Sequence, residues 1–330
     1  MANRRQLLVT AAAAVLAVSA RSWAQVRGRT PVVGYLSPVV PENSTDFRLE
    51  AFRAGMREFG YAEGKNYRLE IRWGEAKLDR MPALAAELVR LKVDVLVAAS
   101  SPAVLAARDA TRTVPIVMPV SSDPVGDGWV ASLARPGGNL TGLSLMQPEL
   151  GAKRLQMLHE VLPRKSRDIA VLWNPAYKGM RARYSETERA APSVGVRVRS
   201  LEVRDPREME AAFDAVAKER PDGLLLLADP LTFSMRARIV EFARENKLPA
   251  IYETRDFVDA GGLLCYGPNT SAMFRRAAYY VDRILKGAKP GELPIEQPAK
   301  IDLVVNLRTA RELGVTIPAS ILANADQVIE

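Results

Sequence analysis

Short apolar runs alternate along the chain with segments in which apolar residues recur at helical spacing. Leu49, Phe52 and Met56 form the first helical stripe, and Gly60 follows it as a residue that commonly ends helices. Strands that alternate with helices in this way predict a parallel sheet covered by helices on both faces. The strands predicted in the first half are residues 31–36, 67–73, 93–98, 115–120 and 140–145, with a short helix at 130–133.

The alternation starts again after a predicted helix at 150–162 and a polar break at 163–166. No close sequence repeat relates the two halves, so their similarity is architectural. The sequence therefore predicts an α/β protein with two doubly wound parallel-sheet lobes. In the second half, strands are predicted at 169–173, 196–203, 223–227, 250–252 and 263–266, and helices at 180–191, 207–218 and 232–246.

The last part of the chain is predicted to return to the first lobe and then to the second. An apolar stripe from Phe274 to Leu285 predicts a helix, and glycines and prolines at 287–294 interrupt the chain before a final strand at 300–305. A short helix at 307–313 and a surface tail follow. Crossings near 163, 267 and 291 would make a multi-strand hinge. The expected lobes are residues 25–163 plus 267–290, and residues 164–266 plus 291–330.

The N-terminus has the features of an export signal. Arg4 and Arg5 precede an apolar run at 7–20, which is shorter than the roughly 20 residues that span a bilayer. Small residues at Ser22 and Ala24 predict cleavage after Ala24, so residues 1–24 would be removed and the mature protein would be periplasmic. The arginine pair resembles a twin-arginine signal, although an ordinary secretory start also fits it.

Composition excludes several classes of function. The formal charge of +8 falls to +5 when Arg4, Arg5 and Arg21 leave with the signal, and the remaining basic residues are interleaved with acids, unlike those of a nucleic-acid binder. Cys265 and His159 are the only residues of their types, so neither an internal disulfide nor a common zinc site is expected. No nucleophile or phosphate-loop motif occurs. We expect no catalytic residue, no metal and no cofactor.

Polar side chains follow the predicted strands at the edge where parallel sheets bind ligands. Backbone N–H groups and hydroxyls at a helix start favour a carboxylate, and a nearby acid can pair with an ammonium group. Each residue could equally cap a helix, and the tyrosines could belong to the core. The candidate ligand-binding residues are Ser37, Ser100, Ser101, Ser121 and Asp123 in the first half, and Asn174, Tyr177, Asp229, Glu253 and Tyr266 in the second.

Five short segments are distinctive in combination: FGYAEGKN at 59–66, DPV at 123–125, RPGGNLTG at 135–142, NLRTA at 306–310 and LG at 313–314. They resemble segments of the substrate-binding proteins of an uncharacterised ABC importer group related to tryptophan- and tyrosine-uptake components. The resemblance covers nearly all of the mature chain. It implies a type I periplasmic-binding fold that clamps a ligand between its lobes. In such relatives the cleft is lined at positions that match the turn at 100–102, Asp123, Asn174 and Tyr266.

The leading hypothesis is an extracytoplasmic solute-binding protein of an ABC importer. It would capture a small polar ligand by hinge closure, an amino acid being one candidate, and deliver it to a membrane permease driven by a cytoplasmic ATPase. Ser100 and Ser101 would hold the ligand carboxylate, and Asp123 or Asp229 its ammonium group. We expect a monomer that binds no nucleic acid. The alternatives are an exported sensor that feeds a membrane receptor and an exported α/β enzyme.

Overall fold

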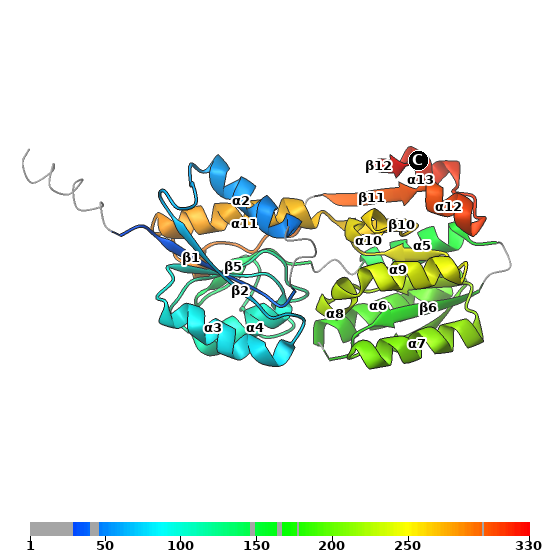
Figure 1. Ribbon diagram of the computed structural model, residues 1–330, viewed down its shortest axis with the longest axis horizontal. Coiled ribbons are helices and arrows are strands. Elements are labelled where there is room, and N and C mark those ends of the chain that lie inside the picture. The colour runs from blue at the N-terminus through cyan, green and yellow to red at the C-terminus, as the bar shows by residue number, and fades with distance from the viewer. Residues whose placement is uncertain (1–28, 40–45, 146–148, 164–166, 177, 299) are drawn as a thin grey trace, which may run out of the picture.

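The computed structural model describes residues 29–39, 46–145, 149–163, 167–176, 178–298 and 300–330. These residues form two α/β lobes that lie side by side along the long axis of the molecule (Figure 1). The signal expected at 1–24 and the candidate Tyr177 lie outside the described residues. Among the helices that can be described, none combines the length and the apolar character needed to cross a membrane.

The first lobe is built on a parallel five-stranded sheet in the order β2-β1-β3-β4-β5. Helices α3 and α4 pack on one face of this sheet, and helices α2 and α11 pack on the other. Its strands are β1 (Val32–Ser37), β2 (Arg68–Trp73), β3 (Val95–Ala98), β4 (Ile116–Met118) and β5 (Leu140–Gly142). Its helices are α2 (Phe47–Glu58), α3 (Met81–Arg90), α4 (Ser101–Ala110) and α11 (Thr270–Leu285), with 3-10 turns at Leu78–Arg80 and Pro290–Glu292.

The second lobe is built on a seven-stranded sheet in the order β12-β11-β10-β9-β8-β6-β7, in which only the β10–β11 pair is antiparallel among the described strands. Its strands are β6 (Asp168–Trp173), β7 (Arg197–Glu202), β8 (Gly223–Leu226), β9 (Ala250–Tyr252), β10 (Leu264–Pro268), β11 (Ile301–Asn306) and β12 (Gln327–Ile329). Its helices are α5 (Glu149–Val161), α6 (Lys178–Val194), α7 (Pro206–Glu219), α8 (Pro230–Ser234), α9 (Arg236–Glu245), α10 (Arg255–Asp259), α12 (Leu307–Leu313) and α13 (Ala319–Ala323).

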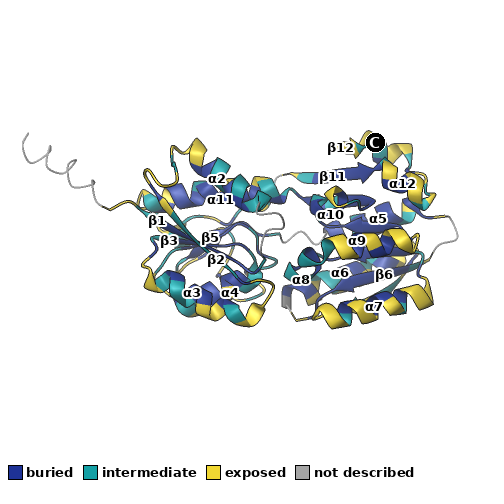
Figure 2. Cartoon of the chain, in the orientation of Figure 1, coloured by how far each residue is buried: buried dark blue, intermediate teal, exposed yellow. Residues whose placement is uncertain are grey.

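Both sheets are buried between helices whose outer faces are exposed (Figure 2). In the second lobe, α5 and α6 cover one face, and α7, α9 and α10 cover the other. This arrangement follows from the sequence pattern, because strands buried on both faces are continuously apolar and the helices over them carry one apolar stripe. The predicted class of two doubly wound parallel-sheet lobes is confirmed.

Two segments pack against a different lobe from the one that the sequence led us to expect. Leu155 and Leu158 of α5 share a core with Ile169 of the second sheet, although residues 149–163 were expected in the first lobe. Conversely, the Ile295 N–H donates to the Leu133 carbonyl at 2.7 Å, so the segment before β11 stays with the first lobe. An amphipathic stripe shows that a helix face is buried but does not specify the sheet that buries it.

Three smaller elements also differ from expectation. Residues 130–133 form bends and irregular backbone rather than a helix, and the helix expected at 232–246 is two helices, α8 and α9. The C-terminal tail, expected as a surface wrap, instead adds β12 to the sheet beside β11. The tail therefore covers what would otherwise be an exposed sheet edge, which is a common way to block edge-to-edge association.

Candidate ligand-binding cleft

A cavity of about 180 Å³ lies between the two lobes, at the ends of strands from both sheets. The first lobe contributes the segments after β1, β3 and β4, and the second contributes the start of α6 and the segments after β8 and β9. Ligands of open parallel sheets bind at this edge, so the position agrees with the general rule. The candidate residues that line the cavity are Ser37, Ser100, Ser101, Ser121, Asp123, Asp229 and Glu253.

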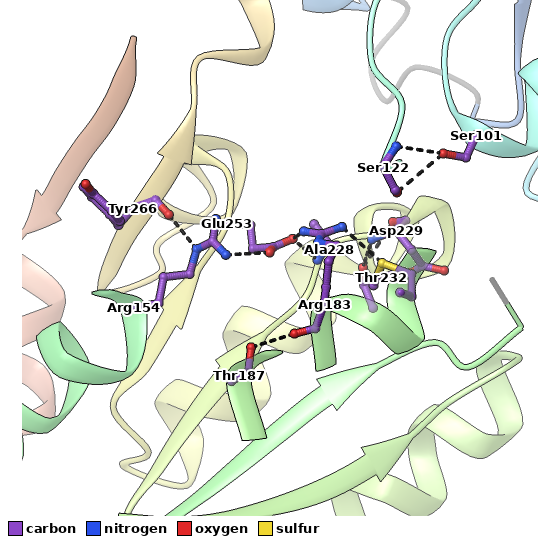
Figure 3. Close-up of polar contacts among 11 residues, drawn as sticks. Ser101, Ser122, Arg154, Arg183, Thr187, Ala228, Asp229, Thr232, Glu253 and Tyr266 are labelled. Carbon is purple, nitrogen blue, oxygen red and sulfur yellow. Dashed lines mark hydrogen bonds and ion pairs between the residues drawn. The ribbon is translucent and has the colours of Figure 1, made fainter. Parts of the chain in front are cut away.

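Serine hydroxyls form the polar part of the first-lobe wall. Ser100 is the N-cap of α4, and its Oγ accepts a hydrogen bond from the Ala103 N–H at 3.4 Å. The Ser101 Oγ accepts the Ser122 N–H at 3.2 Å, which ties the segment after β3 to the segment after β4 (Figure 3). Ser121 is buried, and its Oγ has no hydrogen-bond partner within the described part of the chain. Because a buried hydroxyl without a partner is costly, Ser121 has bonding capacity left for a ligand.

The two aspartates of the cavity wall are both engaged in local turns. Asp123 Oδ1 accepts the Gly126 N–H at 2.8 Å. Asp229 is the N-cap of α8, where its Oδ1 accepts the Thr232 N–H at 2.8 Å and its Oδ2 accepts the side-chain amide of Asn174 at 2.7 Å. Burial raises the pKa of Asp229, although these hydrogen bonds act in the opposite direction. Asp229 is therefore both a helix cap and a residue of the cavity wall.

Asn174 and Tyr266 do not line the cavity, unlike the other described candidates. Asn174 is buried behind Asp229 and orients that carboxylate. Tyr266 was expected in the cleft, but its ring packs with the core beneath α5, because side chains along β10 alternate between the two faces and Cys265 takes the opposite one. Only the Tyr266 carbonyl points towards the site, where it accepts the Nε–H of Arg154 at 2.6 Å (Figure 3).

A buried ionic network forms the floor of the second-lobe wall (Figure 3). Glu253, directly after β9, accepts a hydrogen bond from Arg154 of α5 at 2.8 Å and forms a second ion pair with Arg183 of α6. The Ala228 N–H donates to the same carboxylate at 2.7 Å. Gly267 makes room for this network, since a Cβ there would lie 1.8 Å from the Glu253 carbonyl oxygen.

Burial and ion pairing within the network shift the pKa values of Glu253 and Arg154. Burial alone would raise the pKa of Glu253, but the positive charges of Arg183 and Arg154 and its hydrogen bonds hold that pKa below the ordinary value. For Arg154, burial lowers the pKa despite the attraction of Glu253. Burying a charge is favourable only when it is paired and hydrogen-bonded, which explains why the three side chains converge.

The lobes touch each other at the sides of the cavity. Arg48 of α2 places its guanidinium carbon 3.8 Å from the ring centroid of Phe233 in α8, and the Phe47 ring lies 6.4 Å from the same ring. Near the start of α6, a Cβ on Gly179 would lie 2.9 Å from the Cβ of Ser122. These contacts join α2 and the segment after β4 in the first lobe to α8 and α6 in the second.

Sequence reasoning missed the arginines of the site. Arg48, Arg154 and Arg183 all line the cavity, but each lies on a helix, where a basic residue normally faces solvent. The only available signal was position, because Arg48 and Arg183 lie near the starts of helices that follow strand ends. No cluster of three or more His, Cys, Asp or Glu side chains suited to a metal ion occurs in the ranges that the structure describes.

Two α/β lobes with a cavity between them define the type I periplasmic-binding fold, which is shared by periplasmic binding proteins of much lower sequence identity. The family model described as ABC transporter substrate binding protein matches residues 36–329, so the chain belongs to that family. This is a family of solute-binding proteins and not of enzymes, as the sequence predicted.

Relatives and solved structures agree with this assignment. The chain is 26% identical over 278 residues to a tyrosine-binding protein of Clostridioides difficile, covering 84% of this chain and 79% of that protein. A conserved domain protein from Vibrio cholerae is 28% identical with a TM-score of 0.84, and an ABC domain from Streptococcus pneumonia in complex with L-Trp is 25% identical with a TM-score of 0.83. Each of these two matches covers 91% of this chain and 100% of the other chain.

Proposed function

We propose that this protein is the periplasmic binding component of an ABC importer and that it captures an amino acid between its two lobes. The observation that carries the proposal is a cavity whose walls come from both lobes and combine apolar surface with hydroxyl and charged side chains. A ligand that contacts both walls stabilises the state in which they are close together, which is the requirement for hinge closure. The tyrosine-binding relative and the L-Trp complex support an aromatic amino acid as the first ligand to test.

In this proposal the two walls take different parts of the ligand. The hydroxyl of Ser121 and the backbone N–H groups near Ser101 would donate from the first lobe, and Asp229 would pair with the ligand ammonium group from the second. A nearby cation would offset the burial that raises the pKa of Asp229. The loaded protein would then dock on a membrane permease, and a cytoplasmic ATPase would drive release and transport.

A thermal-shift screen followed by calorimetry tests the ligand class. A ligand that binds only the folded protein stabilises it by about 2.7 kcal/mol at 100 times its dissociation constant. We expect L-tryptophan or L-tyrosine to raise the melting temperature, and Asp229→Ala to weaken that binding more than Asp123→Ala does. A screen in which only sugars or cations raise the melting temperature would contradict the proposal.

Export can be tested separately from ligand binding. We propose that residues 1–24 are removed during export, and support comes from the charged start, the short apolar run and the small residues at Ser22 and Ala24. N-terminal sequencing of protein recovered from the periplasm should begin at Gln25. Protein that stays in the cytoplasm with its N-terminus intact would refute this part of the proposal.

A further inference from the structure

The buried network of the second-lobe wall contains two arginines and one acid. Arg154 and Arg183 share the single carboxylate of Glu253, so the three side chains together carry one net positive charge. Glu253 has no need of a further donor, because it already accepts from both arginines and from the Ala228 N–H. Within this network, therefore, the arginines have more donors than the single acid can accept, although Asp229 and Glu186 also line the wall.

Arg183 is the arginine that presents this charge to the cavity. Its side chain is 21% exposed, whereas that of Arg154 is 5% exposed and has its Nε bound to the Tyr266 carbonyl. A guanidinium has five N–H donors. Within the described residues, Arg183 uses them on one Glu253 oxygen and on the Met180 sulfur at 3.1 Å, which is a weak acceptor. Counted over the described residues, most of its hydrogen-bonding capacity is therefore unused.

The two aspartates of the cavity have hydrogen-bond partners other than Arg183. Asp229 is held by Thr232 and Asn174, and Asp123 is held by its own turn at Gly126. Glu186 lies one turn further along α6 and has interactions of its own, but it is not among the hydrogen-bond partners of Arg183 described above. A partly buried guanidinium with unused donors is a strong site for a carboxylate, because the planar fork matches both carboxylate oxygens.

We propose that Arg183 binds the carboxylate of the captured ligand, and that the protein therefore selects carboxylates over the corresponding amides and amines. The inference deepens the proposed function and rests on it. It moves the carboxylate from Ser100 and Ser101, where the sequence placed it, to the second lobe. The first-lobe hydroxyls then contact other polar groups of the ligand, so that closure brings two chemically different walls onto one molecule.

The test compares acids with their amides in matched variants of the mature protein. L-tryptophan and L-tryptophanamide, L-tyrosine and L-tyrosinamide, and benzoate and benzamide are titrated calorimetrically into the wild type, Arg183→Gln, Arg183→Lys and Arg181→Gln. Arg181 is an exposed residue of the same helix and serves as the control. Urea unfolding of each variant shows whether it is folded. We expect Arg183→Gln to fold, because Glu253 is still paired with Arg154.

We expect Arg183→Gln to weaken binding of the acid by about 10- to 100-fold, the factor that a hydrogen bond between charged groups contributes, and to change binding of the amide by less than about threefold. Arg183→Lys keeps the charge and should retain part of the preference for the acid, and Arg181→Gln should behave as the wild type. An acid-to-amide ratio that survives in Arg183→Gln would overturn the inference.

The outcomes separate this inference from the proposed function. If benzoate binds through Arg183 and no amino acid binds, the inference stands and the amino-acid proposal fails. If an amino acid binds equally well to the wild type and to Arg183→Gln, the proposed function stands and the inference fails. If no carboxylate binds to the wild type, both are contradicted.

Discussion

The two walls of the cleft differ in how firmly their polar groups are held before a ligand arrives. The first-lobe wall presents serine hydroxyls together with Asp123 and Arg48, and the hydroxyl of Ser121 has no partner in the described part of the chain. The second-lobe wall is charged and cross-linked, since Glu253 joins Arg154, Arg183 and a backbone N–H in one buried network. The comparison shows that the second-lobe wall is preorganised around charge. In the proposed capture this wall would hold a charged group of the ligand, and the first lobe would add hydrogen bonds on closure.

The largest effect should come from removing the charge that holds the second-lobe wall together. Glu253→Gln leaves Arg154 and Arg183 side by side without an acid between them. Breaking a buried ion pair in this way costs about 3–5 kcal/mol. Urea unfolding should show that loss, and Ser101→Ala in the first-lobe wall, as the matched comparison, should lose about 1 kcal/mol or less. A loss below about 1 kcal/mol for Glu253→Gln would show that the two walls do not differ as described.

The same network predicts a pH dependence. The pKa of Glu253 is held below its ordinary value of 4.5, so the unfolded chain binds this proton more readily than the folded chain. The stability contributed by Glu253 is therefore present above pH 4.5 and is lost as the pH falls through the lower, folded pKa. Asp229 acts in the opposite sense, because its raised pKa makes its charged form unfavourable in the folded state.

Urea unfolding of the wild type and of Glu253→Gln between pH 3 and 7 checks this sign. The difference in free energy of unfolding between the two proteins should be largest at neutral pH and should shrink as the medium becomes acidic. A difference that grows towards acidic pH would mean that Glu253 is not held in its charged form by the two arginines.

Contact between the walls should depend on a small residue at position 179. Gly179→Leu would place side-chain atoms where the Cβ alone lies 2.9 Å from Ser122, so the lobes could not approach as closely. We expect ligand affinity to fall by about tenfold or more, which corresponds to about 1.4 kcal/mol or more. Ser185→Leu, on an exposed position of the same helix, is the control. Calorimetry that finds equal affinity in both variants would mean that this contact is not needed for capture.

Removing the Ser121 hydroxyl should raise the stability of the ligand-free protein and lower its affinity for the ligand. Ser121→Ala takes away a buried polar group that has no described partner, so the ligand-free protein should become more stable by about 1 kcal/mol. The same change should weaken ligand binding, because the ligand loses a hydrogen bond. Unfolding and titration of one preparation give both numbers. A loss of stability together with unchanged binding would show that Ser121 is structural.

The smallest effect should come from the aromatic contact across the cleft. Arg48→Met removes the cation–π interaction with Phe233, which is worth about 0.5–1 kcal/mol at a partly exposed site. Ligand affinity should fall about two- to fivefold, and Arg57→Met at the far end of the same helix should leave it unchanged. Equal affinities in the two variants would argue against a role of Arg48 in holding the lobes together.

The sequence predicted those parts of the molecule that follow from periodicity along a single segment. The apolar runs located the strands, and the rule on carboxyl ends of parallel strands located Ser100, Ser101, Asp229 and Glu253 at the cavity. What it could not predict depends on packing between distant segments. Arg154 and Glu253 are 99 positions apart, and nothing in either neighbourhood indicates that they meet.

The wrong predictions for α5 and Tyr266 also arise from packing between distant segments. The stripe of α5 predicted a buried face, but the choice between two sheets was made by contacts such as Leu158 against Ile169. Tyr266 follows a strand as the rule requires, yet the alternation of side chains along β10 turns its ring into the core. Strand-end position therefore gives the neighbourhood of a site, and the direction of a side chain decides which residues enter it.

A crystal structure of the mature protein with the carboxylate that gives the largest thermal shift tests the account most directly. The account predicts that the ligand lies between the lobes, with its carboxylate within hydrogen-bond distance of the Arg183 guanidinium and another polar group on Ser121. A ligand whose carboxylate lies on Ser100 and Ser101, with Arg183 still bonded to Glu253 and Met180 and not to the ligand, would contradict it.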